Sequence, residues 1–214
     1  RVSFNRRSLV ASGVLEVFQR LFGSAWGVRM EHILRYILLT LLDQPKATLA
    51  DISKIIHDVT YRTKCMKYIE SEHIKAFWLH EYPKYSKTDV MPILNKVGAF
   101  LAHPVIKRVL IDNPNELSLR KAMDEKKIVL INLSKGYLGD DVAHILGSLL
   151  VTSLSSASFS RIDTFEPLRE PFMIYLDEFQ NFTSLSLVNM LSELRKFKVG
   201  MILAHQYLHQ LEAP

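Results

Sequence analysis

The first 118 residues carry apolar side chains at helical spacing. Between Leu9 and Leu21 an apolar residue returns every three or four positions, which predicts an amphipathic helix that ends at Gly23. A second and longer helix is predicted from Trp26 to Leu42, before Pro45 breaks the chain. Similar spacing predicts a short helix capped by Thr48 and further helical stretches at 61–69, 73–80 and 90–110. We therefore expect residues 1–118 to form an all-α region, whose first helix is a candidate to pack on the domain that follows.

The pattern changes after the turn signal Asn113-Pro114-Asn115. Short apolar runs now alternate with helical stretches, and strands are predicted at 128–133, 172–176 and 199–204. One intervening helix is capped by Asp140 or Asp141; the next is capped by Thr183 or Ser184 and has the inner face Leu187, Met190, Leu191 and Leu194. This order implies right-handed crossovers and a parallel sheet. Residues 119–214 are thus predicted to be an α/β domain.

Two adjacent carboxylates follow the second predicted strand. In PFMIYLDEFQ, residues 171–180, five apolar residues lead directly into Asp177 and Glu178. Ligands of open α/β folds bind at the carboxyl ends of parallel strands, so the pair is placed where a nucleotide would bind. There Asp177 would hold Mg²⁺ and its water shell, and Glu178 would orient the attacking water. The alternative is that the acidic pair only makes the strand end soluble.

The third predicted strand ends in His205-Gln206 and is preceded by Arg195-Lys196. Neighbouring parallel strands end at the same edge, so Gln206 is expected near Glu178. An amide suits that place, because it can donate to a phosphate oxygen and accept from a water. Arg195 and Lys196 stand in the last turn of the helix before this strand, where basic side chains can simply offset the negative end of the helix dipole.

Composition narrows the class of protein only modestly. The 214 residues are 48% hydrophobic, enough for one large domain or two small ones, and the net charge of +5 is a weak bias toward nucleic acid or acidic membranes. A single cysteine, Cys65, excludes an internal disulfide and favours a cytoplasmic location. The longest apolar stretch, 33–42, is shorter than the roughly 20 residues that a bilayer requires, so no span is expected. The opening RVSFNRR suggests a piece cut from a longer protein.

Several segments resemble one family of motor proteins. FMIYLDEFQNF and LSELRKFKVGMILAHQYLHQL resemble the second half of the motor domain in the HerA/FtsK superfamily, specifically the conjugative DNA-transfer coupling proteins related to type IV secretion. WGVRMEHILRYILLTLLDQPKATLADI and IVLINLSKGYLGDDVAHILGSLLV resemble the same group, so the similarity covers most of the chain. The resemblance implies a partial RecA-like P-loop ATPase core at 119–214, with residues 172–176 as its Walker B strand, and an all-α domain before it.

The resemblance also implies an activity, cofactors and partners. Proteins of this kind form hexameric rings that hydrolyse ATP with Mg²⁺ and pull single- or double-stranded DNA through a central pore. By motif, Asp177 matches the Mg²⁺-associated acid, Glu178 the catalytic base and Gln206 the polar sensor. Arg195 resembles an arginine that reaches the nucleotide site of the next subunit. The helical domain of conjugative relatives meets DNA-processing or secretion-complex proteins, and the parent protein is expected to be cytoplasmic or membrane-associated through another segment.

One departure from the family is large. The eight glycines never take the spacing GxxxxGK[ST], so the phosphate-binding loop and its lysine do not occur in these 214 residues. Family architecture places that loop before Arg1. We therefore predict that this chain alone neither holds ATP tightly nor hydrolyses it. The Ser134-Lys135-Gly136 segment lacks the leading glycine and is interpreted as a simple strand-to-helix turn.

Other chemistry finds little support in the sequence. The eight histidines show no metal-binding spacing such as HExxH, and His144 and His209 are interpreted as ordinary polar residues. No Gly-x-Ser-x-Gly elbow occurs. The basic and aromatic stretch 57–87 has two interpretations: a DNA surface, or aromatic residues packed inside a helical domain whose lysines face solvent. These residues are Lys64, Lys67, Lys75, Phe77, Trp78, Tyr82 and Lys84.

Two other functions remain open. A superfamily 1 helicase can carry an acidic motif like DEFQN, but AHQYLHQL lacks the Gly-Asp-x-x-Gln segment that usually follows it. A non-catalytic adaptor or DNA- or protein-binding module would keep the fold without ATP binding, and a phosphate-binding loop upstream of Arg1 would separate the motor from this alternative.

Overall fold

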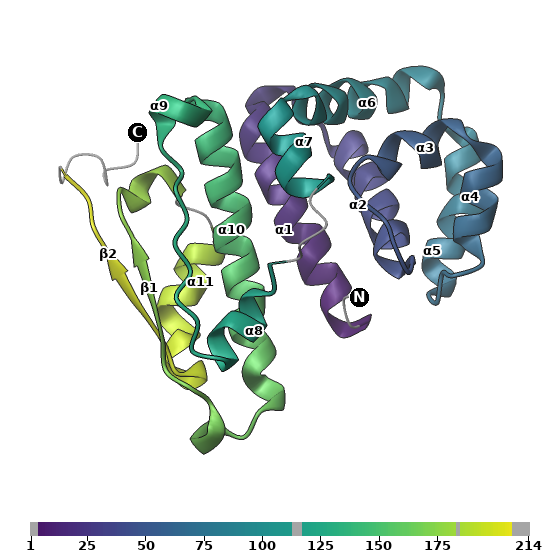
Figure 1. Cartoon of the computed structure of the whole chain (residues 1–214). Helices are drawn as coiled ribbons and strands as arrows, with labels where there is room; N and C mark the ends of the chain where they lie inside the picture. The colour runs from purple at the N-terminus through teal and green to yellow at the C-terminus, as the bar shows by residue number, and fades with distance from the viewer. Residues whose placement is uncertain (1–3, 113–116, 183–184, 207–214) are drawn as a thin grey trace. The chain divides into compact units, whose positions relative to one another are not determined.

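The computed structural model describes residues 4–112, 117–182 and 185–206 and is mostly helical (Figure 1). The chain divides into two compact units, Arg1–Pro114 and Asn115–Pro214. This division falls four residues before the boundary at 118 that the sequence pattern suggested. The described part of the first unit is entirely helical, and that of the second combines helices with a small parallel sheet.

Helices and short turns make up the first unit. Its helices are α1 (Phe4–Phe22), α2 (Val28–Asp43), α3 (Asp51–His57), α4 (Val59–Met66), α5 (Glu72–Ala76), α6 (Lys87–Ala102) and α7 (Pro104–Leu110). A π-helical turn, Phe77–Glu81, follows α5, and Pro104 at the start of α7 divides the predicted stretch 90–110 in two. Thr48 does not cap α3 as expected: the helix begins at Asp51, whose carboxylate accepts from the Thr48 hydroxyl at 3.1 Å.

Helix α2 lies at the centre of this unit. Its apolar side chains Ile33 and Ile37 are fully buried, and its neighbour α1 packs Phe18 against Phe100 of α6, with ring centroids 5.1 Å apart. The buried Arg7 of α1 pairs with Asp43 at the end of α2. Burial raises the pKa of the Asp43 carboxyl, although Arg7 acts in the opposite direction. Helix α1 is thereby joined to α2 within the first unit.

The second unit builds its core on one long helix. Its helices are α8 (Leu119–Asp124), α9 (Lys135–Leu138), α10 (Asp140–Ser160) and α11 (Leu185–Glu193), and its strands are β1 (Phe172–Leu176) and β2 (Val199–Leu203). Val151 and Leu154 of α10, Ile174 of β1 and Met190 of α11 belong to one buried apolar cluster. Leu191, placed on the inner face by the sequence pattern, is 56% exposed, which corrects that prediction. The predicted caps Thr183 and Ser184 lie outside the described residues.

The two strands are parallel and directly paired, from Phe172 opposite Val199 to Leu176 opposite Leu203. One face of this sheet packs on the apolar cluster through Ile174. The other face is open to solvent, where Tyr175 is 70% exposed and Met173 and Ile202 are nearly half exposed. Parallel sheets are ordinarily covered on both faces, whereas the described residues of this unit cover only one.

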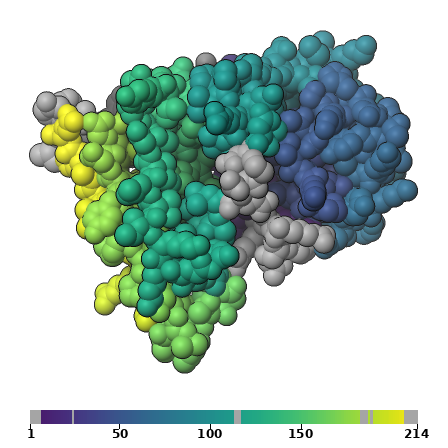
Figure 2. All heavy atoms as spheres, viewed as in Figure 1, coloured from purple at the N-terminus to yellow at the C-terminus, as the bar shows by residue number. Residues whose placement is uncertain are grey.

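The predicted strand 128–133 does not form. In the described part of the chain the sheet has only β1 and β2, and residues 128–133 run as an extended segment without ladder pairing (Figure 1). Ile128 and Leu130 are 89% and 92% exposed, and the segment lies on the surface of its unit (Figure 2). The parallel pair β1–β2 agrees with the α/β prediction, whereas the three-stranded layer was wrong for the described residues.

Helix α10 is long and apolar. Residues Asp140–Asp163 are the one described helical stretch whose length and composition would allow it to cross a bilayer. Its apolar window is 56% buried inside the protein, and the central helix of a globular unit passes the same test. The helix reaches that hydropathy while including several buried serines, so a search for uninterrupted apolar runs does not detect it.

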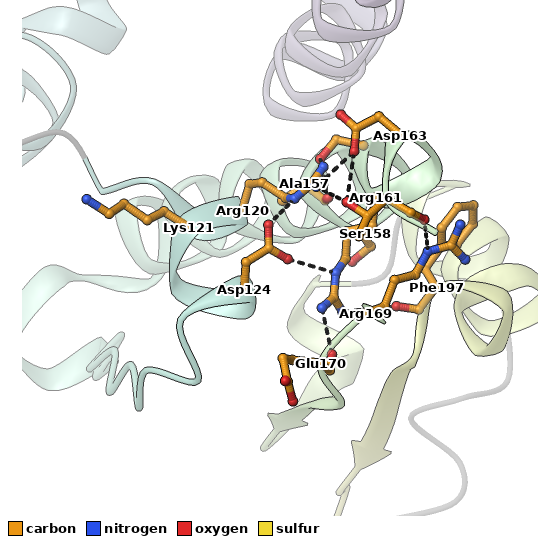
Figure 3. Close-up of polar contacts among 12 residues, drawn as sticks. Arg120, Lys121, Asp124, Ala157, Ser158, Arg161, Asp163, Arg169, Glu170 and Phe197 are labelled. Atoms are coloured by element: carbon orange, nitrogen blue, oxygen red, sulfur yellow. Dashed lines mark hydrogen bonds and ion pairs between the residues drawn. The ribbon is translucent and has the colours of Figure 1, made fainter. Parts of the chain in front are cut away.

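Arg161 joins the starts of both strands (Figure 3). Its fully buried guanidinium follows α10 and donates from Nη1 to the carbonyl of Phe197 at 3.0 Å and from Nη2 to the carbonyl of Glu170 at 2.6 Å. Nε donates to the Asp124 carboxylate of α8 at 3.2 Å. A buried charge is tolerated only when it is hydrogen-bonded in this way. Because Glu170 and Phe197 each stand two residues before a strand, Arg161 fixes where β1 and β2 begin.

Candidate functional site

The candidate site lies where β1 and β2 end. Because the strands are parallel, Asp177 and Glu178, which follow β1, and Gln206, which follows β2, leave the sheet at the same edge. The backbone continues to tie the two strands together there: Ala204 N–H donates to the carbonyl of Leu176 at 2.9 Å, and Phe179 N–H donates to the carbonyl of Ala204 at 3.2 Å. The predicted meeting of the two strand ends is therefore confirmed.

The chain turns sharply at Glu178. Its φ is +49°, in the left-handed region that residues with a side chain seldom adopt, and such strain is concentrated at functional sites. The Asp177 carboxylate accepts from the Glu178 N–H at 3.0 Å, and Asn181 N–H donates to the Glu178 carbonyl at 3.0 Å. These two bonds stabilise the turn that follows the strand, so the two acids are presented at the edge rather than continued into a helix.

Glu178 and Gln206 are in direct contact. Gln206 Nε2 donates to Glu178 Oε1 at 2.7 Å, and Asn181 Nδ2 donates to Glu178 Oε2 at 3.2 Å. Both carboxylate oxygens therefore accept from an amide. An amide that donates to a carboxylate keeps a carbonyl oxygen that can accept a hydrogen from water. The geometry can thus hold a water molecule between a carboxylate base and an amide acceptor.

A Mg²⁺ site here would use few protein ligands. In the part of the chain that the structure describes, no group of three or more His, Cys, Asp or Glu side chains is placed to hold a metal ion. Mg²⁺ in nucleotide sites takes one or two carboxylates, keeps several waters and is completed by substrate phosphates. The exposed carboxylate of Asp177 fits that minimal role, whereas a structural metal centre has no support among the described residues.

Arg195 lies at the other end of β2. It is exposed in the 3₁₀ turn Leu194–Phe197, immediately before the strand, while Gln206 follows the strand. Five strand residues at about 3.3 Å each separate the two ends by roughly 16 Å, so Arg195 does not reach the Glu178 of its own chain. For the helix-dipole interpretation, the structure places Arg195 and Lys196 in the 3₁₀ turn that directly follows α11, which itself ends at Glu193.

Sequence reasoning missed Lys135 and Asn181. Lys135 Nζ lies 3.1 Å from Asn181 Oδ1 and 2.6 Å from the Asp140 carboxylate, and the hydrogen bond and ion pair with Lys135 lower the pKa of Asp140. Ser134-Lys135-Gly136 was interpreted as a simple turn, and its residues do begin the short helix α9. The sequence held no signal that this turn would meet a residue 46 positions away.

The basic and aromatic stretch 57–87 does not present an aromatic DNA surface through its largest rings. Phe77 is fully buried and Trp78 is 4% exposed, and Phe77 stacks on Tyr36 with centroids 4.2 Å apart. Arg62 covers Tyr82 at 5.0 Å from its ring centroid. Phe77 and Trp78 therefore pack the helical unit and cannot stack on bases. The lysines Lys64, Lys67 and Lys84 remain exposed.

Comparison of the chain with protein-family models, with curated proteins and with solved structures finds no match in any of the three.

Proposed function

We propose that this chain is part of an ATP-driven DNA translocase of the HerA/FtsK type, similar to conjugative coupling proteins. The single observation that supports this most is the 2.7 Å hydrogen bond from Gln206 to Glu178 across the carboxyl ends of two parallel strands. A carboxylate base and an amide sensor on neighbouring strands are the protein groups that ATP hydrolysis needs on the water side of the γ-phosphate.

Each site residue has a role in this proposal. Glu178 accepts a proton from the attacking water and orients it, and Gln206 holds that carboxylate in position and binds the same water or a phosphate oxygen. Asp177 is the residue that would hold Mg²⁺, which neutralises charge on the phosphates when it is bound. Arg195 would act on the site of a neighbouring copy in a ring, since it is remote from its own chain's Glu178.

The phosphate-binding loop is the part that these residues do not supply. No GxxxxGK[ST] occurs in the 214 residues, so we expect the chain alone to show no ATP hydrolysis above background. The product of the complete gene is expected to hydrolyse ATP, to be stimulated by DNA and to assemble as a hexamer. Its location is proposed to be cytoplasmic or at the cytoplasmic side of a membrane.

The decisive experiment measures DNA-stimulated ATP hydrolysis by the product of the complete gene. We expect Glu178→Gln to lower the rate by about 100-fold or more, as the loss of a general base does. Glu193→Gln is the matched control, because Glu193 is an exposed carboxylate in the same unit that pairs only loosely with Lys196 at 3.6 Å. Activity that is unchanged by Glu178→Gln would refute the proposal. DNA or protein binding without any hydrolysis would identify the non-catalytic adaptor instead.

A further inference from the structure

Four polar side chains at the strand ends are linked in one row. Lys135 Nζ donates to Asn181 Oδ1 at 3.1 Å, Asn181 Nδ2 donates to Glu178 Oε2 at 3.2 Å, and Gln206 Nε2 donates to Glu178 Oε1 at 2.7 Å. These residues come from α9, from the turn after β1 and from the segment after β2, and Asn181 connects Lys135 of α9 to the Glu178 carboxylate.

The charges in this row fix the orientation of the Asn181 amide. An ammonium group can only donate, and an ionised carboxylate can only accept. The amide placed between them must therefore turn its oxygen to Lys135 and its nitrogen to Glu178, without the ambiguity that usually attends an amide. A hydrogen bond that polarises an amide oxygen strengthens donation by its nitrogen. The position of Glu178 is thus sensitive to what Lys135 binds.

Lys135 is held loosely enough to change partners. Its side chain is 46% exposed and pairs with an Asp140 side chain that is 75% exposed, and ion pairs of this kind contribute little to stability. The other partner is the neutral oxygen of Asn181. A triphosphate brings several negative charges and many acceptor oxygens to the same edge, and a lysine ammonium binds such oxygens as a point charge.

We propose that Lys135 binds a phosphate oxygen of the nucleotide and that Asn181 is a positioning residue that links this event to Glu178. Without nucleotide, Lys135 and Asn181 hold the carboxylate by one oxygen while Gln206 holds the other. With nucleotide, the ammonium turns to the phosphate, Asn181 loses its tether, and Glu178 gains the freedom to take a water. This inference rests on the proposed function and adds two residues to its site.

The linkage can be tested without any hydrolysis, by recording the side-chain amide NMR signals of Asn181 and Gln206 in the 214-residue chain. Lys135→Met should shift the Asn181 signal most, and the Gln206 signal to a smaller extent because Gln206 donates to the same Glu178 carboxylate. Lys127→Met is the matched control, because Lys127 is an exposed lysine paired with Glu125 at 2.7 Å and should shift neither signal. An Asn181 signal that is identical in Lys135→Met and in the unchanged chain would overturn the inference.

The anion step is tested in the same spectra with inorganic triphosphate and Mg²⁺ at millimolar concentration. The Asn181 signal of the unchanged chain should move as triphosphate is added, and in Lys135→Met it should no longer respond. A signal that stays fixed in the unchanged chain, or that moves equally in both, would contradict phosphate binding by Lys135.

Kinetics of the complete gene product separate this inference from the proposed function. Lys135→Met should raise the KM for ATP by about tenfold, the loss expected for one charge-assisted hydrogen bond. Asn181→Ala should change KM little and raise kcat, because it removes the hydrogen bond by which Asn181 holds the Glu178 carboxylate. If Glu178→Gln abolishes hydrolysis while both variants keep normal kcat and KM, the inference alone is wrong. If Glu178→Gln has no effect, the proposed function is wrong whatever the NMR signals show.

Discussion

Arg161 illustrates how a single buried residue prepares the site from a distance. Its guanidinium bonds the carbonyls of Glu170 and Phe197, which precede the two strands, and it has no exposed surface. The acids and the glutamine leave the opposite ends of those strands. A change at Arg161 should therefore act on stability first, and on the site only through the placement of the strands.

We expect Arg161→Met to lower the free energy of unfolding by about 3 kcal/mol. The change leaves the buried carbonyl of Phe197 and the half-buried carbonyl of Glu170 without this donor, and it removes one of the two arginines that pair with Asp124. The measurement is urea denaturation followed by circular dichroism. Arg195→Met makes the same chemical change at an exposed position of the same unit and should have almost no effect. Equal denaturation midpoints for the two variants would contradict the role assigned to Arg161.

At the level of single residues, the sequence predicted the site only in part. Asp177, Glu178 and Gln206 could be found because each directly follows an apolar strand run, and strand ends meet by the rules of parallel sheets. Lys135 and Asn181 could not be found in that way. Their contact depends on how the segment before α10 is placed against a turn far along the chain, and no local pattern encodes that distance.

At the level of elements, the turn after β1 depends on a close approach by α10. A Cβ atom at Gly147 would lie 2.2 Å from the ring of Phe182, which ends the 3₁₀ turn Phe179–Phe182. Real Cβ contacts do not come that close, so either the ring or the helix would have to move. The turn that carries Asn181 therefore fits α10 only because residue 147 is glycine.

Gly147→Ala should destabilise the second unit by about 1–3 kcal/mol, the usual cost of overpacking, and should lower ATP hydrolysis by the complete gene product. Thermal unfolding and the ATPase assay provide the two measurements. Gly136→Ala is the control, because a Cβ there would meet its nearest neighbour, Ser134 Oγ, at an ordinary 3.7 Å. A Gly147→Ala chain as stable and active as the control would show that the turn tolerates the added methyl group.

Elements differ in how well the sequence predicted them. The helices of the first unit and the strands β1 and β2 followed from apolar spacing, within a few residues at their ends. The segment 128–133 did not, because an apolar run predicts a strand only when a neighbouring strand is present to bond its backbone. Among the described residues, no strand pairs with the segment 128–133, and Ile128 and Leu130 face solvent.

At the level of the whole molecule, the position of Arg195 has a consequence for assembly. The residue stands at the start of β2, roughly 16 Å from the end that carries Gln206. If Arg195 serves hydrolysis, it must serve the site of another copy. A ring of identical subunits provides that arrangement, because a head-to-tail interface places one end of each subunit against the other end of its neighbour.

Subunit mixing tests this arrangement in the complete gene product. Arg195→Ala and Glu178→Gln should each be nearly inactive alone, since one removes the arginine and the other the base. A mixture should regain hydrolysis, because some interfaces then combine an intact Glu178 with an intact Arg195 from its neighbour. The ATPase rate of the mixture is the measurement. A mixture no more active than the average of its two components would contradict action between subunits.

Movement along DNA, which the proposed translocase function requires, can be measured as displacement of streptavidin from biotinylated DNA. We expect the complete gene product to remove streptavidin from single- or double-stranded DNA when ATP and Mg²⁺ are present, and the Glu178→Gln variant to bind the same DNA without removing it. Hydrolysis of ATP with no displacement from either form of DNA would contradict the account.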